Sequence, residues 1–258
     1  MNDDSSRAPF FFRGQRGVTL VELMIASLLS LLLIAGVIQI FLGTRQTYRF
    51  LDAMSRLQEN GRFAMSVMSA DIRMANLRVP ANLANLADAI ADDGNGFTVR
   101  WIDGGATATP TADCSGIANC SLRRYFIQAR TAGGTAPSCA AAGNSLFLRR
   151  DNATAQELLE GVQALQILYG ECGDANNDGT LDTPPLNYVA AAAVTDWSRV
   201  CAIRVYLLLV SLEDNVVEQA QGYFFPPDSD TMTTAQDRCL HQAFSTTVAL
   251  RNRMPRCN

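Results

Sequence analysis

One long apolar segment near the N-terminus constrains this chain more than any other feature of its sequence. Residues 18–42 read VTLVELMIASLLSLLLIAGVIQIFL, and at 1.5 Å per residue a helix of this length measures about 37 Å. That exceeds the roughly 30 Å hydrocarbon core of a bilayer, so the segment is long enough to cross a membrane. A secretory signal has a shorter apolar region that ends at a small-residue cleavage site. Here the apolar run continues beyond Ala35 and Gly36, and we predict that the anchor is retained.

The residues on either side of this segment predict its orientation. Residues 1–17 are polar and contain Arg7, Arg13 and Arg16, whereas most of the chain follows the segment. Arginines close to a membrane helix favour the cytoplasmic side. We therefore predict a cytoplasmic leader over residues 1–17, a transmembrane helix over 18–42, and a body on the other side of the membrane.

Glu22 is the single charge inside the apolar segment. A carboxylate at the centre of a bilayer costs about 2.5–3.5 kcal/mol on insertion scales, so its presence needs a physical reason. Considered alone, it is consistent with an acid that lies near enough to the interface to be solvated.

The six residues around this acid, GVTLVE at positions 17–22, resemble the prepilin signature. The resemblance implies that a prepilin peptidase cuts between Gly17 and Val18 and methylates the new amine. Glu22 is then the fifth mature residue, which in that family neutralises the N-terminal amine of a neighbouring subunit in the filament core. Two features depart from the family pattern: position 18 holds valine instead of phenylalanine, which bears on methylation, and the anchor lacks the proline of many major pilins.

The helical pattern continues after the anchor. Apolar residues recur at helix-like spacings at Leu51, Met54, Leu57, Phe63, Val67, Met68 and Ile72. Pro80 offers a stop, so we predict one helix from about Thr19 to Met74. Its amphipathic continuation, residues 43–77, is expected to pack this stripe on a sheet, and Gly36, Gly43 and Gly61 are expected to soften it. Residues 62–76, RFAMSVMSADIRMAN, are similar to the corresponding region of PilW-type minor pilins.

Residues 78–258 are predicted to form a β-rich head domain. The strand candidates are Phe97–Ile102, Leu122–Gln128, Ser145–Arg149, Val162–Tyr169, Val200–Leu212 and Phe244–Leu250. Val200–Leu212 is long and strongly apolar, which predicts a central strand, and Gln156–Gly161 is expected to extend the Val162 strand. Short strands between irregular loops favour an antiparallel sheet. The predicted fold class is α+β, with one long helix packed on an antiparallel sheet.

One loop of the head has the spacing of a calcium ligand set. In residues 174–182, DANNDGTLD, oxygen side chains at relative positions 1, 3, 5 and 9 and glycine at 6 match the start of an EF-hand loop. The candidate ligands are Asp174, Asn176, Asp178, Asp182 and the backbone carbonyl of Thr180. Pro185 stands where an EF-hand has glutamate, so a structural Ca²⁺ site and a polar Asx/Gly turn both remain open.

Seven cysteines, all in the C-terminal part, indicate folding in an oxidising compartment. Sequence cannot determine their pairing. Near neighbours favour Cys114 with Cys120, Cys172 with Cys201 on either side of the calcium candidate, and Cys239 with Cys257. Cys139 is then the odd cysteine.

Composition and the remaining motifs exclude or disfavour several functions. The net charge of −4 argues against direct electrostatic binding of nucleic acid. The chain has no G-x-S-x-G, H-E-x-x-H or P-loop motif, and the sole histidine, His241, has no partner motif. We therefore predict a protein that is not an enzyme, in which His241 is structural or on the surface.

The resemblance implies a minor pilin that helps to prime assembly of the type IV pilus. Its partners would be other minor pilins, the major pilin, the prepilin peptidase and the inner-membrane assembly platform, and a tip complex with an adhesin is left open. It would reside in the inner membrane with its head in the periplasm, and then in the filament. Two alternatives remain: a minor pseudopilin of type II secretion, and a membrane-anchored periplasmic binding protein.

Overall fold

The computed structural model describes residues 17–75, 90–92, 95–102, 120–129, 139, 143–174, 183–185 and 187–251. The chain divides into two compact units, Met1–Tyr48 and Arg49–Asn258. One helix, α1 (Leu20–Met74), runs through both units, and its bounds agree with those expected from the sequence. Pro80, the expected stop, lies outside the described residues.

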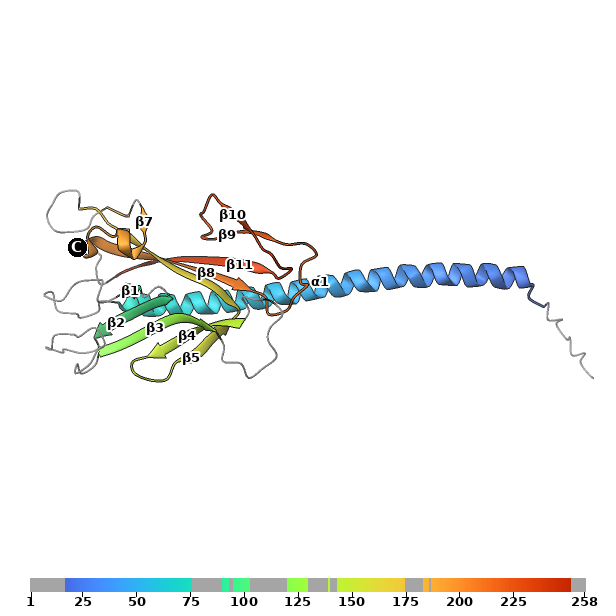
Figure 1. Cartoon of the computed structure of the whole chain (residues 1–258), viewed down its shortest axis with the longest axis horizontal. Helices are drawn as coiled ribbons and strands as arrows, with labels where there is room; N and C mark the ends of the chain where they lie inside the picture. Colours follow the sequence, from blue (N-terminus) through green and yellow to red (C-terminus); the bar gives the residue numbers. More distant parts are fainter. Residues whose placement is uncertain are drawn as a thin grey trace, which may run out of the picture. The chain divides into compact units, whose positions relative to one another are not determined.

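The unit Arg49–Asn258 contains the second half of α1 and all the described strands (Figure 1). The strands are β1 (Ile90–Asp92), β2 (Gly96–Ile102), β3 (Cys120–Ala129), β4 (Asn144–Arg150), β5 (Gln156–Glu160), β6 (Val162–Glu171), β7 (Tyr188–Val189), β8 (Val200–Val210), β9 (Gly222–Phe224), β10 (Met232–Thr234) and β11 (His241–Ala249). Two short 3-10 turns, η3 (Ala191–Ala193) and η4 (Trp197–Arg199), precede β8.

All the described strand pairs are antiparallel, which confirms the α+β class. The strands form two main sheets, however, where the sequence predicted one. A five-stranded sheet has the order β1-β2-β3-β4-β5, and a four-stranded sheet has the order β11-β8-β6-β7, while β9 and β10 form a separate ribbon. β8 lies between β11 and β6, so the prediction of a central strand at Val200–Leu212 is confirmed.

Gly161 is the point at which the chain passes from one sheet to the other. The prediction that Gln156–Gly161 extends the next strand is wrong, because β5 pairs with β4 and β6 pairs with β8. Gly161 has a φ of 70°, a left-handed conformation that breaks a strand and favours glycine. Its N–H donates to the Asn144 carbonyl (3.0 Å) and its carbonyl accepts from the Val210 N–H (2.9 Å). It is therefore bonded to both sheets.

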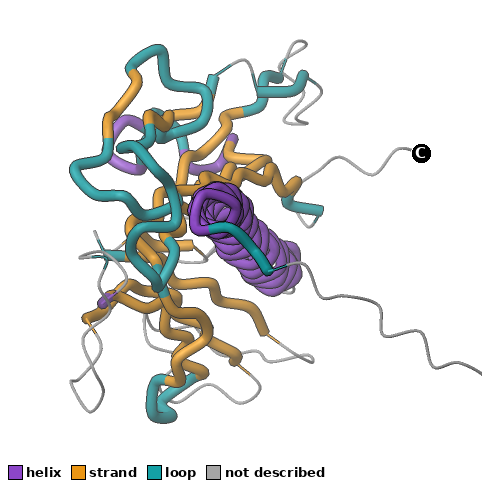
Figure 2. Tube along the Cα trace, turned by 90° about the vertical axis from the view of Figure 1, so that its right-hand side faces the viewer, coloured by secondary structure: helices purple, strands orange, loops and turns teal. Residues whose placement is uncertain are grey.

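The second half of α1, residues 49–74, lies against the strands and supplies one side of the core (Figure 2). Its buried residues are Leu57, Gly61, Ala64, Met65, Met68, Ser69 and Ile72. Met68 and Ile72 are fully buried, and complete burial of such a side chain contributes about 1.5–3 kcal/mol. From β8, the core receives Ile203, Val205 and Leu207.

Two members of the predicted apolar stripe lie outside this core. Leu51 is 58% exposed and Phe63 is 50% exposed. The buried stripe passes through Gly61, and successive helical residues are turned by about 100°. Phe63 is therefore turned about 200° from Gly61 and points away from the sheets, so its assignment to the packing stripe is wrong.

At Gly61 the helix backbone lies against the four-stranded sheet. A Cβ at this position would collide with the ring of Phe244 in β11. The expectation that Gly61 softens the helix is therefore replaced by a packing role, since only glycine lets the Phe244 ring lie against the helix backbone. Gly36 and Gly43 have no such neighbours.

A hydrogen bond ties the helix to the five-stranded sheet. The hydroxyl of Tyr125, a fully buried residue of β3, donates to Asp71 of α1. Burial raises the pKa of the Tyr125 hydroxyl, and the bond to Asp71 raises it further. The tyrosine therefore stays neutral and donates at physiological pH, which satisfies a polar group that would otherwise be buried at a cost.

Candidate assembly motif and the head that carries it

The proposed processing motif lies at the start of α1. Gly17, Val18 and Thr19 precede the helix and are exposed. The Thr19 hydroxyl accepts from the Glu22 N–H (3.2 Å), and the Thr19 carbonyl accepts the first helical bond from the Leu23 N–H (3.1 Å). Thr19 is therefore the N-cap, and its spacing to Glu22 is that of a capping box. The Gly17–Val18 peptide lies outside the helix and is exposed.

The apolar segment of α1, up to Leu42, is exposed in the described structure. Its large apolar side chains are between 50% and 74% exposed from Val18 to Leu42, and none of its most apolar window is buried. Seventeen large apolar side chains exposed to water would be strongly unfavourable, so this segment requires lipid or other helices around it. Together with the motif at its start, this indicates that the helix anchors the chain in a membrane.

Only the first residue of the calcium candidate is described. Asp174 is half-buried, whereas Asn176, Asp178, Thr180 and Asp182 lie outside the described residues. The loop is closed at its base by an antiparallel bridge between Gly173 and Thr183, with N–H···O distances of 3.0 and 3.1 Å. One residue earlier, Cys172 is bonded to Cys201, the pairing that the sequence analysis favoured.

The second described disulfide contradicts the sequence-based pairing. Cys139 is bonded to Cys239, so Cys139 is not the odd cysteine and the pairing of Cys239 with Cys257 is wrong. Cys139 comes from the connection between β3 and β4, and Cys239 from that between β8 and β11. The bond therefore crosslinks the two sheets through their long connections. Cys120 is also disulfide-bonded, and Cys114 and Cys257 lie outside the described residues.

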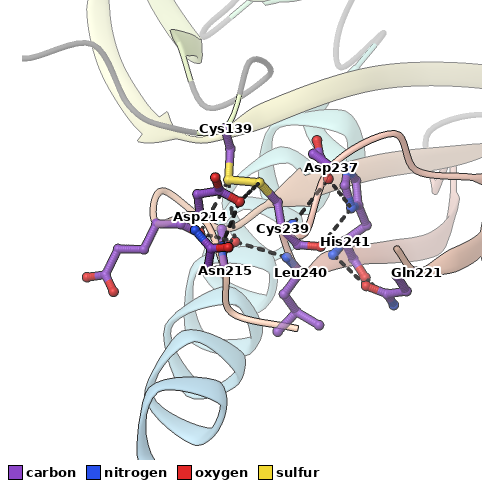
Figure 3. Close-up of a disulfide and its surroundings, with 10 residues drawn as sticks. Cys139, Asp214, Asn215, Gln221, Asp237, Cys239, Leu240 and His241 are labelled. Carbon is purple, nitrogen blue, oxygen red and sulfur yellow. Dashed lines mark hydrogen bonds and ion pairs between the residues drawn. A yellow bond between two sulfur atoms is a disulfide. The ribbon is translucent and has the colours of Figure 1, made fainter. Parts of the chain in front are cut away.

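A polar network surrounds this bond, and it includes His241 (Figure 3). His241 is buried, and its Nδ1 lies 3.2 Å from the Cys239 carbonyl and 3.9 Å from Asp237 Oδ1. Its ring is stacked on Tyr223, with centroids 4.8 Å apart. The backbone of His241 exchanges two hydrogen bonds with the Gln221 amide, at 2.8 and 3.0 Å. These contacts give the sole histidine a structural role, as the sequence predicted.

A second cluster of polar side chains connects the loop between β9 and β10 to the outer face of β8. Asp228 Oδ2 accepts from the Tyr206 hydroxyl (2.6 Å) and from Arg204 Nη1 (3.1 Å). The hydrogen bond from Tyr206 lowers the pKa of Asp228, and the Arg204 charge acts in the same direction. Arg204 also stacks on the Tyr188 ring, 3.8 Å from its centroid. Sequence reasoning missed this cluster, because no local spacing brings these residues together.

A capped N-terminal helix, apolar and exposed in its first half and packed on antiparallel sheets in its second, defines a type IV pilin-like subunit. A family model described as type IV pilus-assembly protein W matches residues 124–252, half of the chain, and a model of the prokaryotic N-terminal methylation motif matches residues 12–38. The chain belongs to the type IV pilus-assembly protein W family, the PilW-type minor pilins. Membership of this family indicates a structural rather than a catalytic protein.

Individual relatives are also pilin-like. The chain is 27% identical over 196 residues to the pilin-like protein PilA3 of Thermus thermophilus, a match that covers 70% of this chain and 78% of that protein. Among solved structures, a type IV-like pilin of Thermus thermophilus aligns with 14% identity and a TM-score of 0.42, covering 78% of this chain and 98% of that one.

Proposed function

We propose that this minor pilin primes assembly of the type IV pilus from the inner membrane, with its head in the periplasm. One observation carries the proposal: an accessible Gly17–Val18 peptide precedes a capped helix whose apolar segment, up to Leu42, is exposed. A prepilin peptidase would cut that peptide and release a subunit held in the membrane by α1. The same apolar surface would then pack among the helices of the filament.

The proposed partners follow from this route. The prepilin peptidase acts first, and the assembly platform of the inner membrane then receives the processed subunit. Other minor pilins and the major pilin would contact the helix and the head, within a tip complex that holds an adhesin. The match to the pilus-assembly family supports a pilus over a type II secretion pseudopilus. Loss of twitching motility rather than of protein secretion, on deletion of the gene, would separate the two systems.

Processing at Gly17 is tested by intact mass spectrometry of the N-terminal peptide, from cells with and without prepilin peptidase. We expect a chain that begins at a methylated Val18 only when the peptidase is present. Because the cut lies outside the helix, Gly17→Ala should retain the cap at Thr19 while it removes the glycine that the peptidase recognises. A chain that begins at Met1 in both strains would overturn the proposal.

We also propose that the loop over residues 174–182 binds calcium. Its residue types and spacing support the proposal, as does the closure of its base by the Gly173–Thr183 bridge and the Cys172–Cys201 bond. A closed base lowers the entropy lost when a loop is ordered around an ion. The ion would brace the loop, with affinity in the range of extracellular calcium modules, about 10⁻⁴–10⁻³ M.

Isothermal titration of the full-length chain in detergent tests this site. We expect saturable heat with Ca²⁺ for the wild type and its loss in Asp178→Ala, because that substitution removes a charged ligand. Asp230→Ala is the matched control, since Asp230 is an exposed acid on another loop. Absence of saturable heat in the wild type, or equal loss in both variants, would leave a polar turn in place of a calcium site.

A further inference from the structure

β11 is the longest strand that lies at the edge of a sheet. It has nine residues, His241–Ala249, and it pairs with β8 along its whole length without a register shift. In the described part of the chain, no strand pairs with its other side. The β9–β10 ribbon contacts it, and Tyr223 of that ribbon lies beside the first residue, His241.

The hydrogen bonds at its two ends show which residues point outward. The Ser211 N–H donates to the Leu240 carbonyl (2.9 Å), and the Leu250 N–H donates to the Cys201 carbonyl (2.8 Å). Alternate residues of an antiparallel strand bond to the same neighbour, so the even-numbered residues between Leu240 and Leu250 bond to β8. The odd-numbered residues therefore direct both backbone groups to the open side.

His241 confirms this assignment and shows how one position is protected. Its N–H and carbonyl are both bonded to the side-chain amide of Gln221, on the side away from β8. The next four outward-facing residues are Ala243, Ser245, Thr247 and Ala249. In the described structure, the backbone N–H and carbonyl groups that these four residues direct to the open side make no hydrogen bond. Gln221 thus closes the edge at its first residue and leaves the remainder open.

The composition of the open stretch matches a strand that accepts another strand. Proteins protect exposed edges with charged residues, proline, bulges or short strands. The segment 243–249, AFSTTVA, has no charged residue and no proline, and its register is regular. Ser245, Thr247 and Ala249 are exposed. At about 3.3 Å per residue the open stretch extends roughly 23 Å. That length accommodates a partner segment of about six or seven residues.

We propose that the open edge of β11, residues 243–249, binds an extended segment of another pilus subunit by β-strand addition. The inference rests on the proposed function, because a pilus-assembly protein meets its sister subunits in the membrane and the filament. In strand addition, main-chain hydrogen bonds supply affinity and alternate side chains supply selectivity. The small side chains at 243, 245, 247 and 249 favour a donor segment with β-branched or aromatic residues opposite them.

Hydrogen exchange resolved to single residues tests this edge. The full-length chain in detergent is compared with its complex with the other minor pilins of its host, obtained by co-expression. In the chain alone, we expect the amides of Phe244, Thr246 and Val248 to exchange slowly and those of Ser245 and Thr247 to exchange fast. In the complex, we expect Ser245 and Thr247 to slow by at least about tenfold, the equivalent of one hydrogen bond of about 1.4 kcal/mol.

One substitution removes a backbone N–H that points outward and leaves the hydrogen bonds between β11 and β8 in place. Ser245→Pro deletes a donor that points away from β8, a position at which edge strands accept proline. We expect it to reduce recovery of the complex about tenfold or more. Ser245→Ala retains the backbone donor and should recover the complex as well as the wild type. Slow exchange at Thr246 and Val248 in Ser245→Pro shows that the ladder with β8 is intact.

Three outcomes would overturn the proposal. The complex could form with Ser245 and Thr247 still exchanging fast, which would show that another surface makes the contact while the pilus role stands. These amides could already be slow in the chain alone at every concentration, which would place a segment of the same chain on the edge. They could slow only as concentration rises, which would show pairing with a second copy.

Discussion

Glu22→Ala is expected to leave the chain processed and membrane-bound but to abolish its entry into pili. The N-cap bond involves the Glu22 backbone N–H and the Thr19 hydroxyl, so removal of the side chain retains the start of the helix. In an assembled filament the substitution would leave the N-terminal amine of a neighbouring subunit without a counter-charge in an apolar core. Removal of one partner from a buried ion pair costs about 3–5 kcal/mol, which corresponds to at least a hundredfold loss in the assembly equilibrium.

The measurement is the amount of this subunit in sheared pili relative to that in membranes, together with twitching motility. Glu59→Ala is the matched control, because Glu59 is an exposed acid on the same helix, outside the apolar segment. Glu22→Gln separates charge from size and should fail as Glu22→Ala does. Normal incorporation of the alanine variant would reduce Glu22 to an acid solvated at the membrane interface.

The Cys139→Ser, Cys239→Ser double variant is expected to lose more stability than any other change in the head. The bond joins residues separated by 100 positions, and a loop of that size gives about 4.7 kcal/mol in the chain-entropy model. Both cysteines are buried, and Leu240, next to Cys239, belongs to the main core. The loss is therefore a large part of the 5–15 kcal/mol or so typical of a folded domain.

The matched control is the corresponding double serine variant at Cys172 and Cys201. Their separation of 29 residues gives about 3.6 kcal/mol in the same model, and their bond lies outside the main core. Denaturant unfolding of the full-length chain in detergent can be followed by the fluorescence of Trp101 and Trp197, which both lie in the head. Equal or smaller destabilisation by loss of the Cys139–Cys239 bond would show that this crosslink between the sheets does not limit stability.

Loop-closure entropy explains why sequence reasoning chose the wrong partner for Cys239. The preference for near neighbours assumes that a long loop is costly, but that cost grows only with the logarithm of loop length. The difference between closing 18 residues to Cys257 and 100 residues to Cys139 is about 1.5 kcal/mol. Complete burial of one large apolar side chain contributes as much, about 1.5–3 kcal/mol, so tertiary contacts can select the pair.

The division of the strands into two sheets could not be predicted from the sequence, for a related reason. Alternation of apolar residues is the same in any strand that has one buried face, so it does not reveal which sheet a strand joins. The division at Gly161 depends on one residue with a positive φ that is bonded to Asn144 and Val210 at once. Phe63 was wrongly assigned to the packing stripe because the type of a residue does not show on which side of the helix the sheets lie.

The sequence by itself determined the features that depend on local chemistry. These are the apolar length of the anchor, the N-terminal methylation motif, the extent of α1, the α+β class and the strong central strand β8. The tertiary structure alone decided the division into two sheets, the Cys139–Cys239 bond, the close contact at Gly61 and the open edge of β11. The physical reason is that periodicity and residue type determine structure over a few neighbouring residues. Pairing between distant segments is decided by how they pack in the folded chain.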